Sequence, residues 1–172
     1  YASMYLPRGA PVVAAKMGDR WEIAVADNPI AKQKLVAVSF VNGIPTTSGG
    51  THVQAILSQT SAAFIEALRK RRAGEDRVET LVENSLAIFI KCLVENPTFS
   101  SQTKEALKTR PKDFGSSCDV PDTFLKKAVA QLGVLPKLME ALEGRDAKAA
   151  KKTDGAKTTA VRGVPKLSDA AL

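Results

Sequence analysis

The sequence has few of the residues that build disulfide frameworks or zinc sites. Its 172 residues include two cysteines, Cys92 and Cys118, and a single histidine, His52, with no C-x-x-C pair. Disulfide scaffolds and structural zinc sites need more of these residues at short spacing. We therefore expect no metal ligated by this chain, and a reducing compartment.

Long hydrophobic runs are also absent. The longest apolar stretch, residues 86–94, is interrupted by Lys91 and is far shorter than the roughly 20 residues that a membrane-spanning helix needs. The chain opens without an initiator methionine and without a basic segment leading into an apolar signal core. We expect no membrane span and no targeting peptide, and we interpret the sequence as a piece of a longer protein.

The composition is that of a folded domain. Hydrophobic residues make up 44% and charged residues 25% of the chain, a mixture typical of soluble globular proteins. The length suits one domain with room for a tail. The net charge of +7 favours a polyanionic neighbour such as nucleic acid, although many basic proteins bind nothing of that kind.

Three β-prone runs predict a sheet. Residues 21–26 and 35–41 are separated by the turn-type sequence Asp27-Asn28-Pro29, which predicts an antiparallel pair. Residues 86–94 are almost continuously apolar, as in a strand that is covered on both faces, so we expect this strand in the middle of the sheet.

Helical periodicity fills most of the remaining sequence. Apolar residues recur at helical spacing from Thr51 to Leu68, which predicts a long amphipathic helix. Further helices are expected from Phe124 and over a second apolar stripe (Val134, Leu135, Leu138 and Leu142). From Gly144 onward large apolar residues become rare, and we expect an extended or partly disordered end. Together these elements predict an α+β domain with a mixed sheet and long helices on one face.

The segment after the predicted central strand carries the most specific motif. Glu95-Asn96-Pro97-Thr98-Phe99 is followed by Ser100-Ser101 and then by Gln102-Thr103-Lys104. This segment resembles the eukaryotic-type type IIA DNA topoisomerases (DNA topoisomerase II), in which the same run leads into a Gln-Thr-Lys loop. Matches in the family's order continue along the chain, at residues 39–42, 47–53, 114–116 and 163–169.

The resemblance covers nearly the whole chain and corresponds to the family's transducer domain. It implies a fold like that of ribosomal-protein domain 2, with residues 1–150 forming the transducer and residues 151–172 a basic extension toward the DNA-cleavage core. It also implies a role in a homodimeric, ATP-dependent enzyme that acts on DNA, in the nucleus or alternatively in a mitochondrion or another DNA-containing organelle. No membrane partner is implied.

ATP is the cofactor that the resemblance implies, bound mainly by an ATPase domain that would precede this segment in the same polypeptide. Mg²⁺ would belong to the full enzyme and would not be ligated by this chain. The Asn-bearing and Gly-rich motifs of the family's ATPase domain and its Tyr-bearing cleavage domain have no match here. We expect this chain alone to neither hydrolyse ATP nor cut DNA.

The same resemblance assigns roles to the loop residues. Lys104 would contact the γ-phosphate of ATP as the catalytic residue, since an ammonium suits a phosphate that gains negative charge during transfer. Gln102 would add neutral hydrogen bonds near that phosphate, and Thr103 would space the two. From the residues alone, without the flanking motif, the favoured interpretation is that Lys104 begins a helix on a solvated face.

A basic cluster ends the predicted long helix. Arg69, Lys70, Arg71 and Arg72 stand where the family has a Lys-rich loop that resembles a contact to DNA. Arginine and lysine both neutralise phosphates, so a salt-dependent contact without sequence preference is expected. A solvated helix end is the alternative, because basic residues favour the negative end of the helix dipole.

Other interpretations use the same residues differently. His52 follows Gly49-Gly50 and could suggest a catalytic base, but we favour a structural role because no nucleophile with a supporting acid accompanies it. The chain could also be a stand-alone basic nucleic-acid-binding module. A small phosphotransferase using Lys104 is disfavoured, because no acidic pair with metal-ligand spacing is present.

Overall fold

The computed structural model describes residues 1–30, 34–72 and 78–154. Within them the chain forms one compact unit, Tyr1–Met139, and the beginning of a second, Glu140–Leu172. The strands are β1 (Val12–Met17), β2 (Trp21–Asp27), β3 (Val36–Val41), β4 (Ile44–Pro45) and β5 (Leu86–Cys92). The helices are α1 (Thr51–Arg71), α2 (Glu79–Asn84), α3 (Asp122–Gln131) and α4 (Val134–Asp154), with short 3-10 turns at Ala2–Met4 and Pro111–Asp113.

The sheet is mixed and has β5 at its centre, as predicted. The strand order is β1-β2-β5-β3-β4, with β5 antiparallel to β2 and parallel to β3. The predicted antiparallel pair of residues 21–26 with residues 35–41 is wrong, because β5 lies between these strands. The five residues from Leu86 to Ile90 are at most 1% exposed, and only a strand with neighbours on both sides and cover on both faces can bury such a run.

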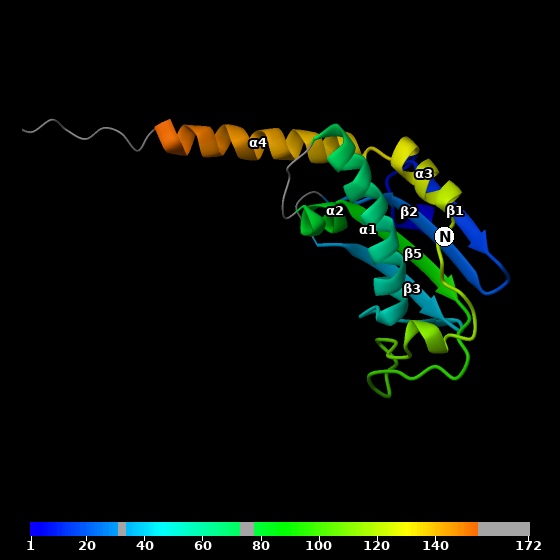
Figure 1. Ribbon diagram of the computed structural model, residues 1–172. Coiled ribbons are helices and arrows are strands. Elements are labelled where there is room, and N and C mark those ends of the chain that lie inside the picture. The colour runs from blue at the N-terminus through cyan, green and yellow to red at the C-terminus, as the bar shows by residue number, and fades with distance from the viewer. Residues whose placement is uncertain (31–33, 73–77, 155–172) are drawn as a thin grey trace, which may run out of the picture. The chain divides into compact units, whose positions relative to one another are not determined.

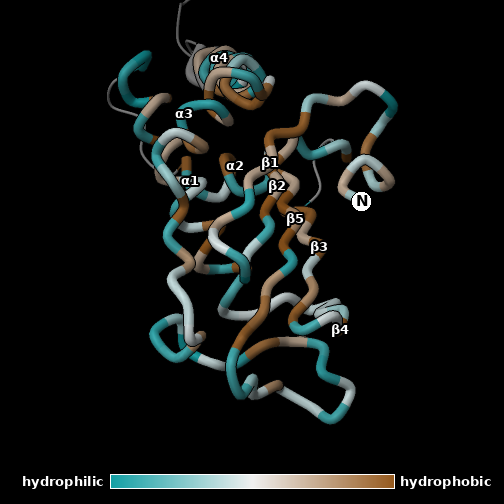
Figure 2. Tube along the Cα trace, turned by 90° about the vertical axis from the view of Figure 1, so that its right-hand side faces the viewer, coloured by the Kyte–Doolittle hydropathy of each residue, from teal (hydrophilic) through white to brown (hydrophobic). Residues whose placement is uncertain are grey.

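Helices α1, α2 and α3 cover one face of the sheet, and the N-terminal segment covers part of the other (Figures 1 and 2). Helix α1 buries Val53, Ile56, Phe64 and Leu68, so the predicted helix and its apolar face are confirmed. On the opposite face, a core cluster joins the N-terminal segment to the sheet (Ala2, Leu6, Ala24, Ala26, Ala87 and Phe89). The α+β class with helices on one face is therefore as expected.

The C-terminal helices are partly as predicted. Helices α3 and α4 are present, and the apolar stripe that begins at Val134 is buried. The expectation of an extended or partly disordered end from Gly144 is wrong as far as Asp154, because α4 continues to that residue. Alanine and lysine have high helix propensity even where no face is buried. The shortage of large apolar residues after Gly144 therefore did not mean that the helix ends there. The matching motif at residues 163–169 lies outside the described residues.

Candidate functional site

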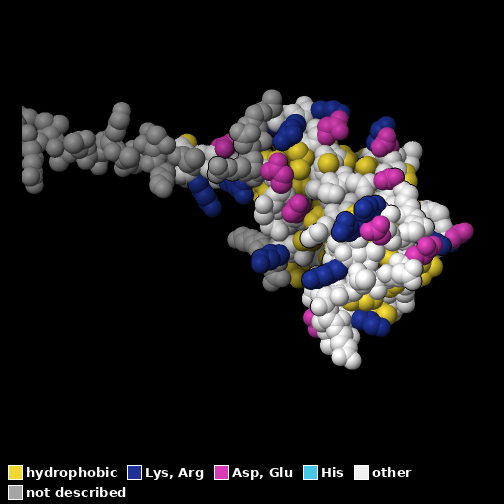
Figure 3. Space-filling model, turned by 60° about the horizontal axis from the view of Figure 1, so that its bottom comes forward, with side chains coloured by type: hydrophobic (Ala, Val, Ile, Leu, Met, Phe, Trp, Pro, Cys, Tyr) yellow, Lys and Arg dark blue, Asp and Glu magenta, His cyan; other side chains and the backbone are white. Residues whose placement is uncertain are grey.

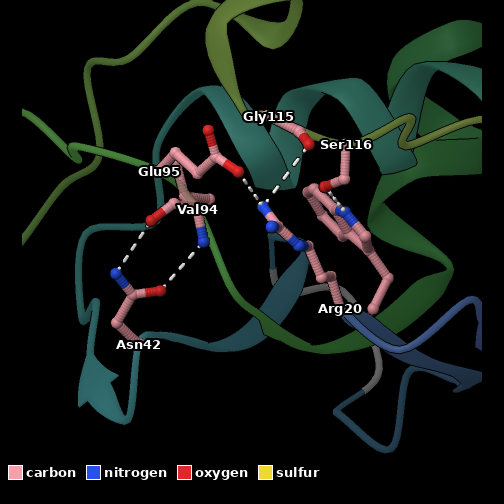
Figure 4. Close-up of polar contacts among 7 residues, drawn as sticks. Arg20, Asn42, Val94, Glu95, Gly115 and Ser116 are labelled. Atoms are coloured by element: carbon pink, nitrogen blue, oxygen red, sulfur yellow. Dashed lines mark hydrogen bonds and ion pairs between the residues drawn. The ribbon is translucent and has the colours of Figure 1, made fainter.

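The candidate site is the Gln-Thr-Lys loop, residues 98–108, together with the residues that hold it. The chain leaves β5 in a fixed direction because Asn42 clamps Val94. The Asn42 side chain donates from Nδ2 to the Val94 carbonyl (2.9 Å) and accepts at Oδ1 from the Val94 amide (2.8 Å) (Figure 4). Asn42 has φ 51°, a left-handed conformation that asparagine tolerates better than most residues.

A second set of contacts holds the segment that returns from the loop. The Arg20 guanidinium donates from Nη1 to Glu95 Oε1 (2.6 Å) and to the Gly115 carbonyl (3.4 Å) (Figure 4). Trp21 donates from Nε1 to Ser116 Oγ (2.9 Å). Gly115 has φ 73°, and a Cβ there would run into the Glu95 side chain. This glycine therefore allows the outgoing and returning segments to lie against each other.

The base of the loop is tied to the start of α1. Leu107 is 1% exposed and forms a parallel bridge with Gly50: its amide donates to the Gly49 carbonyl (3.1 Å), and its carbonyl accepts from the Thr51 amide (3.1 Å). A Cβ on Gly50 would lie 2.5 Å from the Leu107 nitrogen, and φ of Gly50 is 133°. Only glycine allows this approach of the two backbones.

Side chains reinforce the same base. Thr51, the first residue of α1, donates from Oγ1 to the Thr109 carbonyl (2.6 Å). Thr109 is buried, and its hydroxyl accepts from the Thr98 amide (2.8 Å). The amide of Ser48 donates to the Glu105 carbonyl (2.9 Å). A displacement of the loop would therefore also displace the N-terminal end of α1, because these hydrogen bonds join the two.

The loop tip brings Gln102, Thr103 and Lys104 together, and all three are exposed. The Ser101 and Thr103 hydroxyls are 2.7 Å apart, and the Lys104 amide donates to the Ser101 carbonyl (3.1 Å). Lys104 has φ 60°, and Nζ lies 6.0 Å from the centroid of the Phe99 ring. Within the described residues the Lys104 ammonium forms no ion pair, so its charge can be offered to an anion.

A helix beginning at Lys104, the alternative that the residues alone allowed, is not formed. Lys104 is in the left-handed region, and Leu107 pairs in extended form with Gly50 and Phe99. Residues that could have continued a helix are used for backbone pairing with distant segments. Their local sequence does not reveal those partners.

The basic cluster lies at the other end of α1. Arg69, Lys70 and Arg71 are exposed in the last turn, and Arg72 caps the helix. Lys70 Nζ lies 2.7 Å from Glu66, and Arg69 Nη2 lies 3.8 Å from Glu79. A helix of 21 residues is roughly 30 Å long at 1.5 Å per residue. The structure therefore keeps the two predicted sites apart, at opposite ends of one helix.

His52 is fully buried, which favours the structural role. Its Nε2 lies 3.3 Å from Thr46 Oγ1, and that hydroxyl is 2.6 Å from Ser39 Oγ. Nδ1 has no hydrogen-bond partner among the residues that the structure describes. Burial lowers the pKa of His52 to about 4. A neutral imidazole sealed from solvent cannot exchange protons with a substrate.

The two cysteines are unreactive in this setting. Burial raises the pKa of the Cys92 thiol to about 12, and burial also raises the pKa of Cys118. Thiolates are the nucleophilic form, so neither side chain is activated. No group of three potential metal ligands occurs in residues 1–30, 34–72 and 78–154. In the same ranges no helix is long and apolar enough to cross a membrane.

Sequence reasoning found the loop tip and the basic cluster but missed the residues that hold the loop. Arg20 gave no motif of its own, since it acts through a distant carboxylate and a distant carbonyl, and Thr51 lies in the matching segment 47–53 without a motif that indicates its bond to Thr109. Asn42 lies in one of the matching segments, and that match was the available signal for its role.

Comparison with known proteins places these features in a family. Residues 7–157 match the family described as DNA gyrase B. The chain is 39% identical over 170 residues to DNA topoisomerase 2 of Pisum sativum, covering 95% of this chain and 11% of that protein. It is also 39% identical over 159 residues to DNA topoisomerase 2 of Saccharomyces cerevisiae, covering 92% and 11%. The chain thus spans about a tenth of the length of these relatives.

Solved structures with similar folds include two from type II topoisomerases. The ATPase and transducer domains of DNA topoisomerase II from Balamuthia mandrillaris superpose with a TM-score of 0.75 and 34% identity, over 81% of this chain and 35% of that one. The ATPase region of Saccharomyces cerevisiae topoisomerase II gives a TM-score of 0.71 and 36% identity, over 83% and 35%.

Proposed function

The chain belongs to the DNA gyrase B family, and on that premise we propose that it is the transducer domain of an ATP-dependent type II DNA topoisomerase. In this role it couples ATP binding and hydrolysis in an adjacent ATPase domain to opening of the DNA gate and passage of a strand. Its relatives are named DNA topoisomerase 2. Residues 151–172 are then an extension toward the DNA-cleavage core, and the working enzyme is a homodimer in the nucleus or a DNA-containing organelle.

The observation that carries the proposal is the attachment of the Gln-Thr-Lys loop to α1. An exposed tip alone could bind a ligand without consequence for the rest of the domain. Here Leu107 is hydrogen-bonded to Gly49 and Thr51 at the first turn of a 21-residue helix. A displacement of the loop tip is transmitted to the start of α1 through these backbone hydrogen bonds. Because the helix is rigid, the displacement then reaches the basic cluster at its other end.

The tip residues fit a phosphate ligand. The Lys104 ammonium is exposed and has no ion pair within the described residues, and the Ser101 and Thr103 hydroxyls lie 2.7 Å from each other in the same loop tip. ATP, held mainly by the ATPase domain, supplies the phosphoryl group. Lys104 then neutralises charge on the γ-phosphate and Gln102 adds neutral hydrogen bonds. Mg²⁺ belongs to the full enzyme and is not ligated by this chain, and this chain alone is inactive.

The basic cluster is the proposed DNA contact, at the end of α1 opposite the Gln-Thr-Lys loop. Arg69, Lys70 and Arg71 are exposed at the last turn, where they can neutralise DNA phosphates without reading base sequence. If a parent protein carried no ATPase domain, the same cluster would instead favour a stand-alone basic nucleic-acid-binding module.

The test is steady-state ATP hydrolysis by the longer protein that includes the upstream ATPase domain, comparing Lys104→Ala with wild type. We expect a fall of about 10²-fold, the scale for loss of one preorganised charge-stabilising donor. Lys126→Ala, which removes an exposed lysine from α3, is the matched control and should retain the wild-type rate. An unchanged rate in Lys104→Ala would contradict the γ-phosphate contact.

A further inference from the structure

The Asp27 carboxylate joins the end of β2 to the first turn of α4. Its Oδ2 accepts from Lys137 Nζ at 2.7 Å, and the Asp27 side chain is only 15% exposed. On the face of the molecule in Figure 3, Lys and Arg side chains instead stand among Asp and Glu side chains at the surface. Exposed pairs of that kind contribute little to stability, so the burial of Asp27 distinguishes this pair as a fixed contact.

Gly133 leaves room for the Asp27 carboxylate at the start of α4. A Cβ at position 133 would lie 2.8 Å from Asp27 Oδ2, so a larger residue would push the carboxylate away from this place. The Lys137 amide donates to the Gly133 carbonyl (3.3 Å). Lys137 is therefore held by its backbone and its side chain in one turn, within the unit Tyr1–Met139.

The opposite end of β2 is attached to the two segments that flank the Gln-Thr-Lys loop. Arg20, which directly precedes the strand, donates to Glu95 (2.6 Å) and to the Gly115 carbonyl (3.4 Å). Trp21, the first residue of the strand, donates to Ser116 Oγ (2.9 Å). One strand thus has side chains at both ends that are bound to segments far away in the sequence.

The strand between these two ends is rigid. From Trp21 to Ala26 it pairs with β1 on one side and with β5 on the other. Four of its side chains are at most 2% exposed (Trp21, Ile23, Val25 and Ala26). At about 3.4 Å per residue the strand spans about 20 Å. Because it is paired on both sides, it can transmit a displacement from one end to the other.

We propose that β2 is a second connection from the Gln-Thr-Lys loop, leading to α4, and that Asp27 and Lys137 are positioning residues that attach the first turn of α4 to it. The inference rests on the proposed function, since such a connection serves coupling only if the loop responds to ATP. It deepens that function because the connection through α1 begins at Leu107 and uses neither of these residues. The two connections can therefore be broken separately.

The experiment measures DNA relaxation events per ATP hydrolysed by the parent enzyme carrying Lys137→Met, which keeps the apolar stem but cannot donate to Asp27. We expect this ratio to fall by about three-fold or more, because a hydrogen bond between charged groups is lost, while ATP hydrolysis continues. Lys137→Arg keeps a donor and should retain the wild-type ratio.

The matched control is Lys91→Met. Lys91 Nζ lies 3.7 Å from Glu22 of β2, and its side chain is 56% exposed, against 60% for Lys137. This pair connects β2 only to the neighbouring strand β5. Its removal should therefore leave the ratio unchanged.

Two further variants separate position from charge and test the strand without nucleotide. Gly133→Ala displaces the Asp27 carboxylate and leaves every charge in place, so it should lower the ratio as Lys137→Met does. Arg20→Gln weakens the loop end of β2. In the 172-residue chain it should speed hydrogen exchange of the amides in the first turn of α4 several-fold, whereas Lys91→Met should not.

Several results would overturn the proposal. An unchanged ratio in Lys137→Met would do so, as would an equal fall in Lys137→Met and Lys137→Arg. Exchange in α4 that does not respond to Arg20→Gln would show that β2 transmits nothing. If Gly133→Ala lowers thermal stability, the comparison of Lys137→Met with Lys137→Arg decides. Failure of the proposed function is seen separately, as unchanged ATP hydrolysis in Lys104→Ala, because the exchange measurement contains no nucleotide.

Discussion

The two ends of α1 are held by different kinds of interaction. At the N-terminal end, backbone hydrogen bonds join Gly49 and Thr51 to Leu107. The two backbones approach so closely at Gly50 that no larger residue fits at that position. At the C-terminal end, exposed ion pairs such as Lys70 with Glu66 connect the helix to itself and to α2. Buried backbone contacts fix position, whereas exposed ion pairs contribute little to stability. The first end is suited to receiving a displacement, and the second to presenting charge to a ligand.

The largest expected effect comes from breaking the rigid end. Gly50→Ala would put a Cβ 2.5 Å from the Leu107 nitrogen at φ 133°, and we expect the free energy of unfolding to fall by at least about 3 kcal/mol. The control Gly43→Ala has φ 79° but meets nothing within 4 Å, and it should cost only about 1 kcal/mol. Urea unfolding of both variants measures the difference. Equal decreases in stability would show that the close approach to Leu107 is unimportant.

A smaller effect at the same end depends on pH. Burial lowers the pKa of His52 from 6.5 to about 4, so the unfolded chain binds this proton more readily than the folded chain between these values. The free energy of unfolding should therefore fall as the pH falls through this window, by about 2 kcal/mol from His52 between pH 7 and pH 5. The measurement is urea unfolding of wild type and His52→Gln across this range. Identical pH dependence in the two proteins would exclude His52 as the source.

The smallest effect is expected at the basic end. Lys70→Ala removes the ion pair with Glu66, in which both side chains are largely exposed. Solvent screens such pairs, so the urea midpoint should not change measurably. A clear decrease in stability would mean that this end is also held rigidly, and the contrast between the two ends would disappear.

Much of the fold could be predicted because the relevant signals are local. The period of apolar residues marked α1 and its buried face, and the unbroken apolar run of β5 marked the central strand. Alternation of side chains tells which face a strand buries but not which strand lies beside it. The pairing of β2 with β5 was missed for that reason, and β1 was not predicted at all.

The candidate site also has a part that a local motif predicts and a part that depends on contacts between distant residues. Gln102, Thr103 and Lys104 were found from a contiguous motif, and the structure brings them together at an exposed tip. The contacts that make the loop more than a surface feature join residues about 50 to 60 positions apart, as in Thr51 with Thr109. No local pattern encodes such a pair, so its discovery required the three-dimensional arrangement.

The most direct test of coupling through the loop base is the number of DNA relaxation events per ATP hydrolysed by the parent enzyme carrying Thr51→Ala. This change removes the hydroxyl that donates to the Thr109 carbonyl and leaves Lys104 in place. Removal of a hydrogen bond of about 1 to 1.5 kcal/mol should lower the ratio several-fold while ATP hydrolysis continues. The control Ser58→Ala removes a hydroxyl that bonds only within α1 and should leave the ratio unchanged. An unchanged ratio in Thr51→Ala would contradict transmission through this contact.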